Sequence, residues 1–365
     1  MSSPEPTIAA DPGHPVANGG SNKTGNGTIP NGSNKTGSNG SIPNGSKKTE
    51  SNGTTVPNGK KSSSPTAASI SGALHKDLIT RGVYKSNPLG TSTFVGLRAL
   101  DPLLQFGLLG GSGLSWGESI LSRLGIPAIP FIDHALTTTP DIDISSTILF
   151  PSSPSLSPTS LGGLLGLPTP RLIIFLMATG SSLKQIFWLL YTSREEFTPS
   201  AAITVSAYNT LVNSLASLLL IAIPTSASLA PSRISIPLPV VGTFTLPLPM
   251  AIGSALYISG MSIETASEVH RKKFKDKPKN KGEVCTTGLW SKARHINYAG
   301  YTLWRTGYAL AAGGWIAGGL VAAWHVWGFA YRSIGLMDEY MSGRYKEKWE
   351  AYKKDVRWKL VPGIY

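Results

Sequence analysis

NYAGYTLWRTGYALAAGGWIAGGLVAAWHVWGFAYR, residues 297–332, decides the fold class of this chain. Its interior carries only Arg305 and His325 as ionisable groups apart from tyrosines, and Gly313-Gly314 divides it into two apolar runs. Each run has about 17 residues, or roughly 26 Å at the rise of an α-helix, close to the hydrocarbon thickness of a bilayer. We therefore expect a helical hairpin embedded in a membrane.

Four apolar runs upstream of this hairpin are predicted to be further membrane helices. The clearest is 201–223, followed by 172–191 and 246–261, and the weakest is 94–114, because Arg98 and Asp101 lie inside it. The sequence thus predicts an all-α, polytopic membrane helix bundle of about six transmembrane helices. Between residues 94 and 261 we find no polar pattern that identifies a substrate.

Charge and composition support a membrane protein. Only 15% of the residues are charged, and the formal net charge of +13 is concentrated in the segments around residues 271–281 and 344–359. Such basic flanks favour the cytosolic side of a membrane, and no soluble basic domain suggests nucleic acid as a partner. Both termini are therefore expected in the cytosol. With Cys285 as the single cysteine and the histidines scattered, we expect no metal site.

Three regions are expected along the chain. Residues 1–75 form a low-complexity tail of Ser, Asn, Gly and Thr with an imperfect internal repeat, which is expected to be disordered. Residues 90–262 hold the first transmembrane helices, with a long Pro- and Ser-rich loop at 125–170. Residues 263–365 hold a basic loop, the hairpin and a basic, aromatic tail.

Residues 288–304 carry the groups with the most chemistry. Arg294, His295 and Asn297 offer hydrogen-bond donors for phosphate or carboxylate oxygens, while Trp290 and Tyr298 offer flat faces for a nicotinamide or adenine ring. This set could hold a dinucleotide, or it could be an interfacial belt that anchors helix ends without any ligand. Ionisable residues inside the hairpin add weight to a functional site.

The order GLW, RH-x-NY, an apolar hairpin and the ending RYKEKWEAYKKDVRWKLVPGIY resembles the C-terminal region of the steroid 5-alpha-reductase-like superfamily. The ending is most similar to that of the sterol reductases. The resemblance covers roughly residues 260–365, and its motifs are specific only as a combined order. It implies an endoplasmic reticulum membrane enzyme that uses NADPH to saturate a carbon–carbon double bond in a sterol or another lipid.

The resemblance also implies roles for individual residues. Tyr298 or His295 would be the acid that protonates the substrate carbon. A cofactor site would comprise Trp290, Arg294, His295, Asn297 and Tyr298, with Glu339 and with Tyr345, Trp349 and Tyr352 on the tail. For the arginine-rich, acidic run of the sterol reductases, only Arg332, Asp338 and Glu339 could substitute.

The chain departs from the reductase pattern at several positions. Tyr301 stands where the reductases usually have Glu or Asp, and Lys346 replaces the glycine of their KYG motif. A second hypothesis is a methyltransferase that uses S-adenosylmethionine, because isoprenylcysteine carboxyl and phospholipid methyltransferases share a similar RHP-x-Y element, here with Ile296 instead of proline. A third is a non-catalytic membrane scaffold of the same fold.

Overall fold

The computed structural model describes residues 84–114, 116–131, 165–193, 195–238 and 242–365. The tail predicted at 1–75 and most of the loop predicted at 125–170 lie outside these residues. The described part is mostly helical. Its long helices are α2 (Pro88–Leu108), α6 (Thr169–Phe187), α7 (Pro199–Ile221), α8 (Leu248–Asp276) and α9 (Ile296–Gly328).

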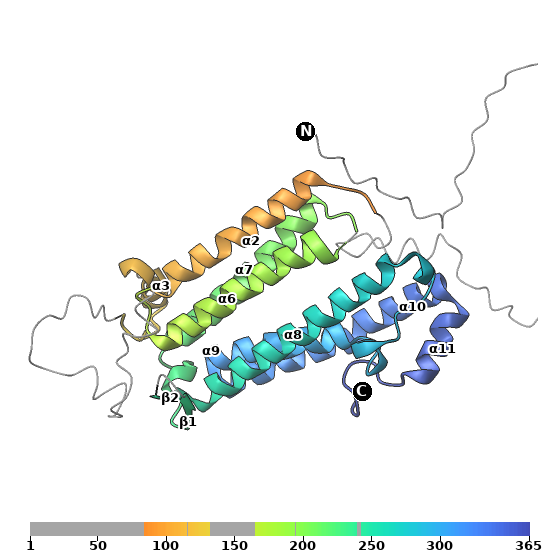
Figure 1. Cartoon of the computed structure of the whole chain (residues 1–365). Helices are drawn as coiled ribbons and strands as arrows, with labels where there is room; N and C mark the ends of the chain where they lie inside the picture. The colour runs from red at the N-terminus through yellow and green to blue at the C-terminus, as the bar shows by residue number, and fades with distance from the viewer. Residues whose placement is uncertain (1–83, 115, 132–164, 194, 239–241) are drawn as a thin grey trace, which may run out of the picture. The chain divides into compact units, whose positions relative to one another are not determined.

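The long helices pack side by side in two groups (Figure 1). Helices α2, α6 and α7 pack against one another, and α8 and α9 pack along their lengths, with α9 also contacting α7. Local sequence starts these helices where they begin. The Asn87 side chain accepts a hydrogen bond from the Gly90 N–H, and Thr198 caps α7 in the same way through Ala201. Each is followed by proline, which is preorganised for a first helical turn.

The membrane character of the chain follows from three described segments that are long and apolar enough to cross a bilayer: Thr169–Thr192, Pro199–Ile221 and Ile296–Tyr345. They correspond to two of the predicted upstream spans and to the hairpin region. Helices α2 and α8 are not among these candidates, so the predicted count of six is not confirmed. The charged residues that each carries lower its hydropathy.

Helix α9 reverses direction at the two glycines that divide its apolar runs. Gly314 adopts φ +70°, and a Cβ on Gly318 would lie 2.9 Å from the Cβ of Leu310, which requires the two arms to fold back on each other. At the other end of the arms the rings of Tyr298 and Phe329 stack with centroids 4.5 Å apart. The region is therefore a tight antiparallel hairpin.

Small residues bring α8 and the first arm of α9 into close contact. A Cβ on Gly253 would meet the carbonyl oxygen of Gly307 at 2.5 Å, and one on Gly300 would meet the backbone nitrogen of Glu264 at 2.6 Å. Such backbone approach is possible only without side chains at these points. It places Glu264 and Glu268 of α8 directly against the Arg-His-x-Asn-Tyr segment.

Two sequence expectations about this region were wrong. The run ending near residue 261 was expected to give way to a basic loop, but α8 continues to Asp276. The residues of its last turns have good helix propensity, and they pack against the tail and α9. The periodicity of the apolar run alone does not reveal this packing. The all-α expectation also missed a small antiparallel sheet, β1 (Arg233–Leu238) paired with β2 (Gly242–Pro247).

The tail folds back onto the start of α9. Helices α10 (Ile334–Tyr345) and α11 (Glu347–Asp355) are joined at Lys346, the one non-glycine residue with positive φ (+50°) in the described part of the chain. Beyond α11, the carbonyls of Trp358 and Lys359 accept hydrogen bonds from the backbone N–H groups of Arg294 and His295, at 2.9 and 2.8 Å. The tail is therefore locked to the Arg-His segment by main-chain bonds.

Between residues 94 and 261, where the sequence shows no polar pattern that identifies a substrate, the structure contains a buried set of polar residues. Polar residues spaced along α2, α6 and α7 turn inward and form a buried network. Arg98 pairs with Asp101 at 3.2 Å, and Asp101 also accepts from Asn213 at 2.6 Å. The other members of this network on these three helices are Gln105, Ser181, Ser182, Gln185, Asn209, Thr210, Ser214 and Ser217. Serine and asparagine scattered among apolar residues gave only a weak signal in the sequence.

Candidate functional site

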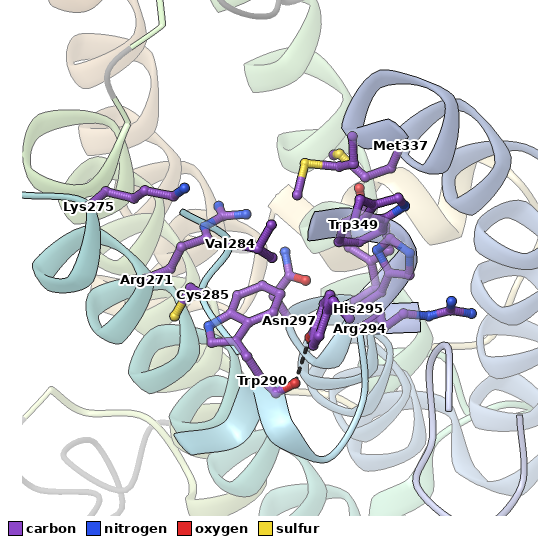
Figure 2. Close-up of a pocket in the computed structure, with 13 residues that line it drawn as sticks. Arg271, Lys275, Val284, Cys285, Trp290, Arg294, His295, Asn297, Met337 and Trp349 are labelled. Atoms are coloured by element: carbon purple, nitrogen blue, oxygen red, sulfur yellow. Dashed lines mark hydrogen bonds between the residues drawn. The ribbon is translucent and has the colours of Figure 1, made fainter. Parts of the chain in front are cut away.

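A pocket lies where the end of α8, the start of α9 and the tail helices meet (Figure 2). Its lining combines cations, aromatic rings and two methionines: Arg271, Lys275, Val284, Cys285, Trp290, Arg294, His295, Asn297, Tyr298, Met337, Met341, Trp349 and Tyr352. In Figure 2 Arg271 and Lys275 lie on one side of Trp290, and Arg294 lies on the other. The pocket is therefore flanked by positive charge.

Glu268 organises the polar floor of this site although it does not line the pocket itself. One carboxylate oxygen accepts from the Asn297 side-chain amide at 2.8 Å, and the other accepts from Arg271 at 2.6 Å. Because a carboxylate only accepts, Asn297 must direct its NH₂ toward Glu268, which leaves its oxygen as the acceptor for a ligand. These two hydrogen bonds to Glu268 hold the side chains of Asn297 and Arg271 in fixed orientations.

Trp290 is fixed as an inner wall of the pocket. It is buried, its indole N–H donates to the carbonyl of Ser267 at 2.9 Å, and its own carbonyl accepts from the Tyr352 hydroxyl at 2.5 Å. Burial raises the pKa of Tyr352, which therefore stays protonated and keeps this donor role at neutral pH. The Arg271 guanidinium lies 5.1 Å from the Trp290 ring.

The cations of the pocket are incompletely neutralised. Arg271 is paired with Glu268, and Lys275 donates to the Tyr345 hydroxyl at 2.8 Å and to the Glu283 carbonyl. The Nε of Arg294 is buried with no hydrogen-bond partner among the described residues. No carboxylate belongs to the lining given above. An unsatisfied guanidinium nitrogen in a cationic pocket suits an anionic ligand.

His295 and Tyr298 form a stack at the mouth of the hairpin. Their rings lie 5.3 Å apart and nearly parallel, and Tyr298 stacks on Phe329 of the second arm on its other face. Burial, followed by the neighbouring Arg294, lowers the pKa of His295 to about 4, so the imidazole is neutral at pH 7. Neutral imidazole is a poor proton donor, which leaves Tyr298 as the stronger acid candidate of the two.

The structure brings most of the predicted site residues together. Those that line one pocket are Trp290, Arg294, His295, Asn297, Tyr298, Trp349 and Tyr352. Tyr345 packs beside the tail cluster without lining the pocket, and Glu339 is exposed and does not reach it. The neighbouring Asp338 instead accepts from the Trp349 indole at 2.8 Å. The carboxylate that contacts this part of the site is therefore Asp338, one residue before the predicted Glu339.

Arg271 and Lys275 are functional candidates that sequence reasoning assigned only to a basic loop. Glu264, Glu268, Arg271 and Lys275 recur at helical spacing, so they share one face of α8, and this pattern could have identified them. The signal was hidden because the helix was expected to end before them.

The tryptophans near the site do not form the lipid-exposed belt that the sequence left open as an alternative. Trp290 and Trp304 are buried, and exposed tryptophan rings lie instead at Trp324 and Trp327.

The pocket is small, with a volume of about 50 Å³. That is room for only a few water molecules, so a large ligand requires the tail side chains to move. Met337 and Met341 line the tail side, and methionine is the side chain that adapts most easily to such a change. Among the residues that the structure describes, no group of three His, Cys, Asp or Glu side chains could hold a metal ion.

Comparison with known proteins gives two kinds of relative. Residues 204–356 match the family described as "Protein of unknown function (DUF1295)". The probable O-methyltransferase ustE of Ustilaginoidea virens is 32% identical over 270 residues, covering 74% of this chain and 84% of the relative.

The Delta(14)-sterol reductase of Neurospora crassa is 28% identical, covering 32% of this chain and 33% of the relative. The 7-dehydrocholesterol reductase of Danio rerio is 33% identical over 92 residues, covering 24% of this chain and 18% of the relative. The match therefore spans at most about a third of the length of these two reductases.

Proposed function

We propose that this chain, whose residues 204–356 form a DUF1295 domain of the steroid 5-alpha-reductase-like superfamily, is a membrane reductase that uses NADPH to saturate a carbon–carbon double bond in a lipid-soluble substrate. The observation that carries the proposal is the cation-flanked, carboxylate-free lining of the pocket. NADPH carries several negative phosphate charges. S-adenosylmethionine carries a positive sulfonium, which such a lining disfavours.

Within this proposal the residues of the pocket divide into binding and chemical roles. Arg294, with its unpartnered Nε, and the cations of α8 would bind phosphate oxygens. Trp290 and Trp349 would contact the flat rings of the cofactor, and the Asn297 oxygen would accept from an amide. When bound, NADPH supplies the hydride that one substrate carbon receives.

Tyr298 would donate the proton that the second carbon receives. Its position at the junction of pocket and hairpin suits this role, because the ring borders the cytosolic cavity on one side and the membrane-embedded arms on the other. Protons from cytosolic water would restore the hydroxyl after each turnover. His295, neutral and stacked on the ring, would position Tyr298.

The same proposal sets the cellular arrangement. The pocket and the basic end of α8 lie on the cytosolic side of the endoplasmic reticulum membrane, where NADPH is available. The substrate approaches from the bilayer. Sterols are one class of candidate substrate by similarity to the sterol reductases, and other unsaturated lipids are equally compatible with the pocket.

An S-adenosylmethionine-dependent O-methyltransferase is the second candidate function. It is favoured by one observation: ustE, named a probable O-methyltransferase, is similar over 84% of its length, whereas the reductases are similar over a third or less. The methyltransferase activity is that given in the name of the relative. The cations that line the pocket of this chain would repel a cationic cofactor. The two candidates differ in the sign of the charge that the site must bind.

Equilibrium binding to the full chain in lipid nanodiscs tests the proposal. We expect saturable binding of NADPH, a loss of at least about tenfold in Arg294→Ala, and no change in the matched control Lys292→Ala, an exposed cation two residues away. Saturable binding of S-adenosylmethionine alone contradicts the reductase proposal and supports the second candidate. Binding of neither cofactor supports a scaffold.

A further inference from the structure

Arg305 is a buried cation in the middle of the first hairpin arm. Only 1% of its surface is exposed, and every described partner is neutral. Its Nε donates to the Tyr301 hydroxyl at 3.3 Å, Nη1 donates to Asn213 Oδ1 at 3.4 Å, and Nη2 donates to Asn209 Oδ1. The guanidinium also lies 4.2 Å from the Trp304 ring.

The other buried cations of the described bundle are all compensated. Arg98 pairs with Asp101, Lys184 pairs with Glu264, and Arg171 pairs with Glu118. No carboxylate forms an ion pair with Arg305 among the described residues. Asp101 is linked to it only through Asn213 and is already paired with Arg98, so these three charged groups keep a net positive charge within the membrane region. Burying an unpaired charge away from water is costly, and intramembrane ionisable residues of this kind are characteristic of functional sites.

The location of Arg305 relates it to the proposed active site. Arg305 follows Tyr298 by two helical turns on α9, or about 10 Å toward the hairpin bend at the α-helical rise. Aromatic rings occupy the interval: Tyr301 contacts the ring of Phe329 and the ring of His325 on the second arm. A flat, apolar molecule could contact these rings while one end lies near Tyr298.

Tyr208 on α7 is a partly exposed neighbour of Arg305. Tyr208 lies close enough to Tyr301 and Arg305 to interact with both electrostatically, and 42% of its surface is exposed. Tyr301 itself is only partly buried. Movement of these two phenol rings would open the guanidinium to a molecule that arrives from the hydrocarbon region.

We propose that Arg305 is the substrate-recognition residue, and that the substrate is an apolar, ring-containing molecule with an anionic oxygen, a carboxylate or an ionised phenol, about 10 Å from its reducible bond. The inference rests on the proposed function for the identity of the reaction, but not for the anion site. The ligand oxygen would replace one of the neutral amide acceptors and supply the missing negative charge. A neutral sterol would leave Arg305 uncompensated.

The test uses 2-naphthoate and its isosteric neutral amide, 2-naphthamide, with the full chain in nanodiscs and empty nanodiscs as the partition control. We expect naphthoate to bind at least about tenfold more tightly than naphthamide. Arg305→Gln should abolish the preference, while Arg305→Lys should retain much of it. Tyr301→Glu, which places a carboxylate one helical turn from Arg305, should also abolish it by supplying an internal counterion.

Equal affinities for acid and amide, no binding of naphthoate, or a preference that survives Arg305→Gln would each overturn the inference. NADPH titration of the same variants separates this result from the proposed function. If the acid preference is present but only S-adenosylmethionine binds, the anion site stands and the reductase does not. If NADPH binds but no acid preference is found, the reductase stands and the substrate is neutral.

Discussion

Asn297 on α9 donates a 2.8 Å hydrogen bond to Glu268 on α8, and this contact fixes the orientation of the amide in the pocket. Glu268 simultaneously holds Arg271 at 2.6 Å, so one carboxylate determines the placement of two pocket-lining residues. The two helices can supply this contact because glycines allow their backbones to approach closely nearby.

Exchanging the amide for a carboxylate should therefore disable the site. Asn297→Asp places two carboxylates against each other, and we expect the Kd for NADPH to rise about tenfold or more, since the Asp side chain repels Glu268 and lacks the donor. Titration in nanodiscs measures the effect. The double variant Glu268→Gln with Asn297→Asp reverses the donor and acceptor and should recover part of the affinity; an additive loss instead would disprove the coupling.

Tyr298→Phe should separate binding from chemistry. The ring stack with His295 and Phe329 is preserved, whereas the proton donor is removed, so NADPH affinity should remain within about twofold while kcat falls at least about a hundredfold. Single-turnover kinetics with the natural substrate, identified as the unsaturated compound that accumulates in a deletion strain, provide the measurement. Full activity in Tyr298→Phe would exclude the hydroxyl as the acid.

His295 should make the protein less stable in mild acid. Its folded-state pKa of about 4 lies below the ordinary 6.5, so the unfolded chain binds more protons between these values. The contribution of His295 to the free energy of unfolding is therefore constant well above pH 6.5. It decreases by about 3 kcal/mol as the pH falls from there to 4.

Thermal denaturation of native protein and His295→Gln between pH 7.5 and 4 measures this difference as a function of pH, in roughly half-unit steps. The variant should lose less stability over the interval, while His270→Gln, at an exposed histidine on α8, should follow the native curve. Parallel curves for native protein and His295→Gln would contradict the prediction.

Lys346 should be a point of backbone strain between the tail helices. Its φ of +50° with ψ −123° is a conformation that glycine adopts readily and other residues do not. We expect Lys346→Gly to raise the free energy of unfolding by about 1 kcal/mol, measured by thermal or denaturant unfolding. Lys346→Ala is the matched control, because it also removes the charge but keeps the strain; equal stabilisation by both variants would refute the backbone explanation.

Several features were predictable because they depend on local sequence. The apolar runs identified two of the candidate spans and the hairpin region, since hydropathy and length are properties of a single segment. Seven of the residues predicted for the cofactor site line one pocket; four of these, Arg294, His295, Asn297 and Tyr298, lie within five positions of the chain, just before and in the first turn of α9.

Other features depended on how helices rotate and register against one another. Sequence alone determined a membrane protein with an Arg-His-x-Asn-Tyr segment at the entrance of an apolar hairpin. Only the tertiary structure decided that Glu268 meets Asn297, that Asp338 rather than Glu339 reaches Trp349, and that Arg305 lies among neutral groups. The reason is physical: charge pairing in a bundle depends on interhelical packing, and the hydrophobic pattern of one segment does not specify which face of its neighbour it will contact.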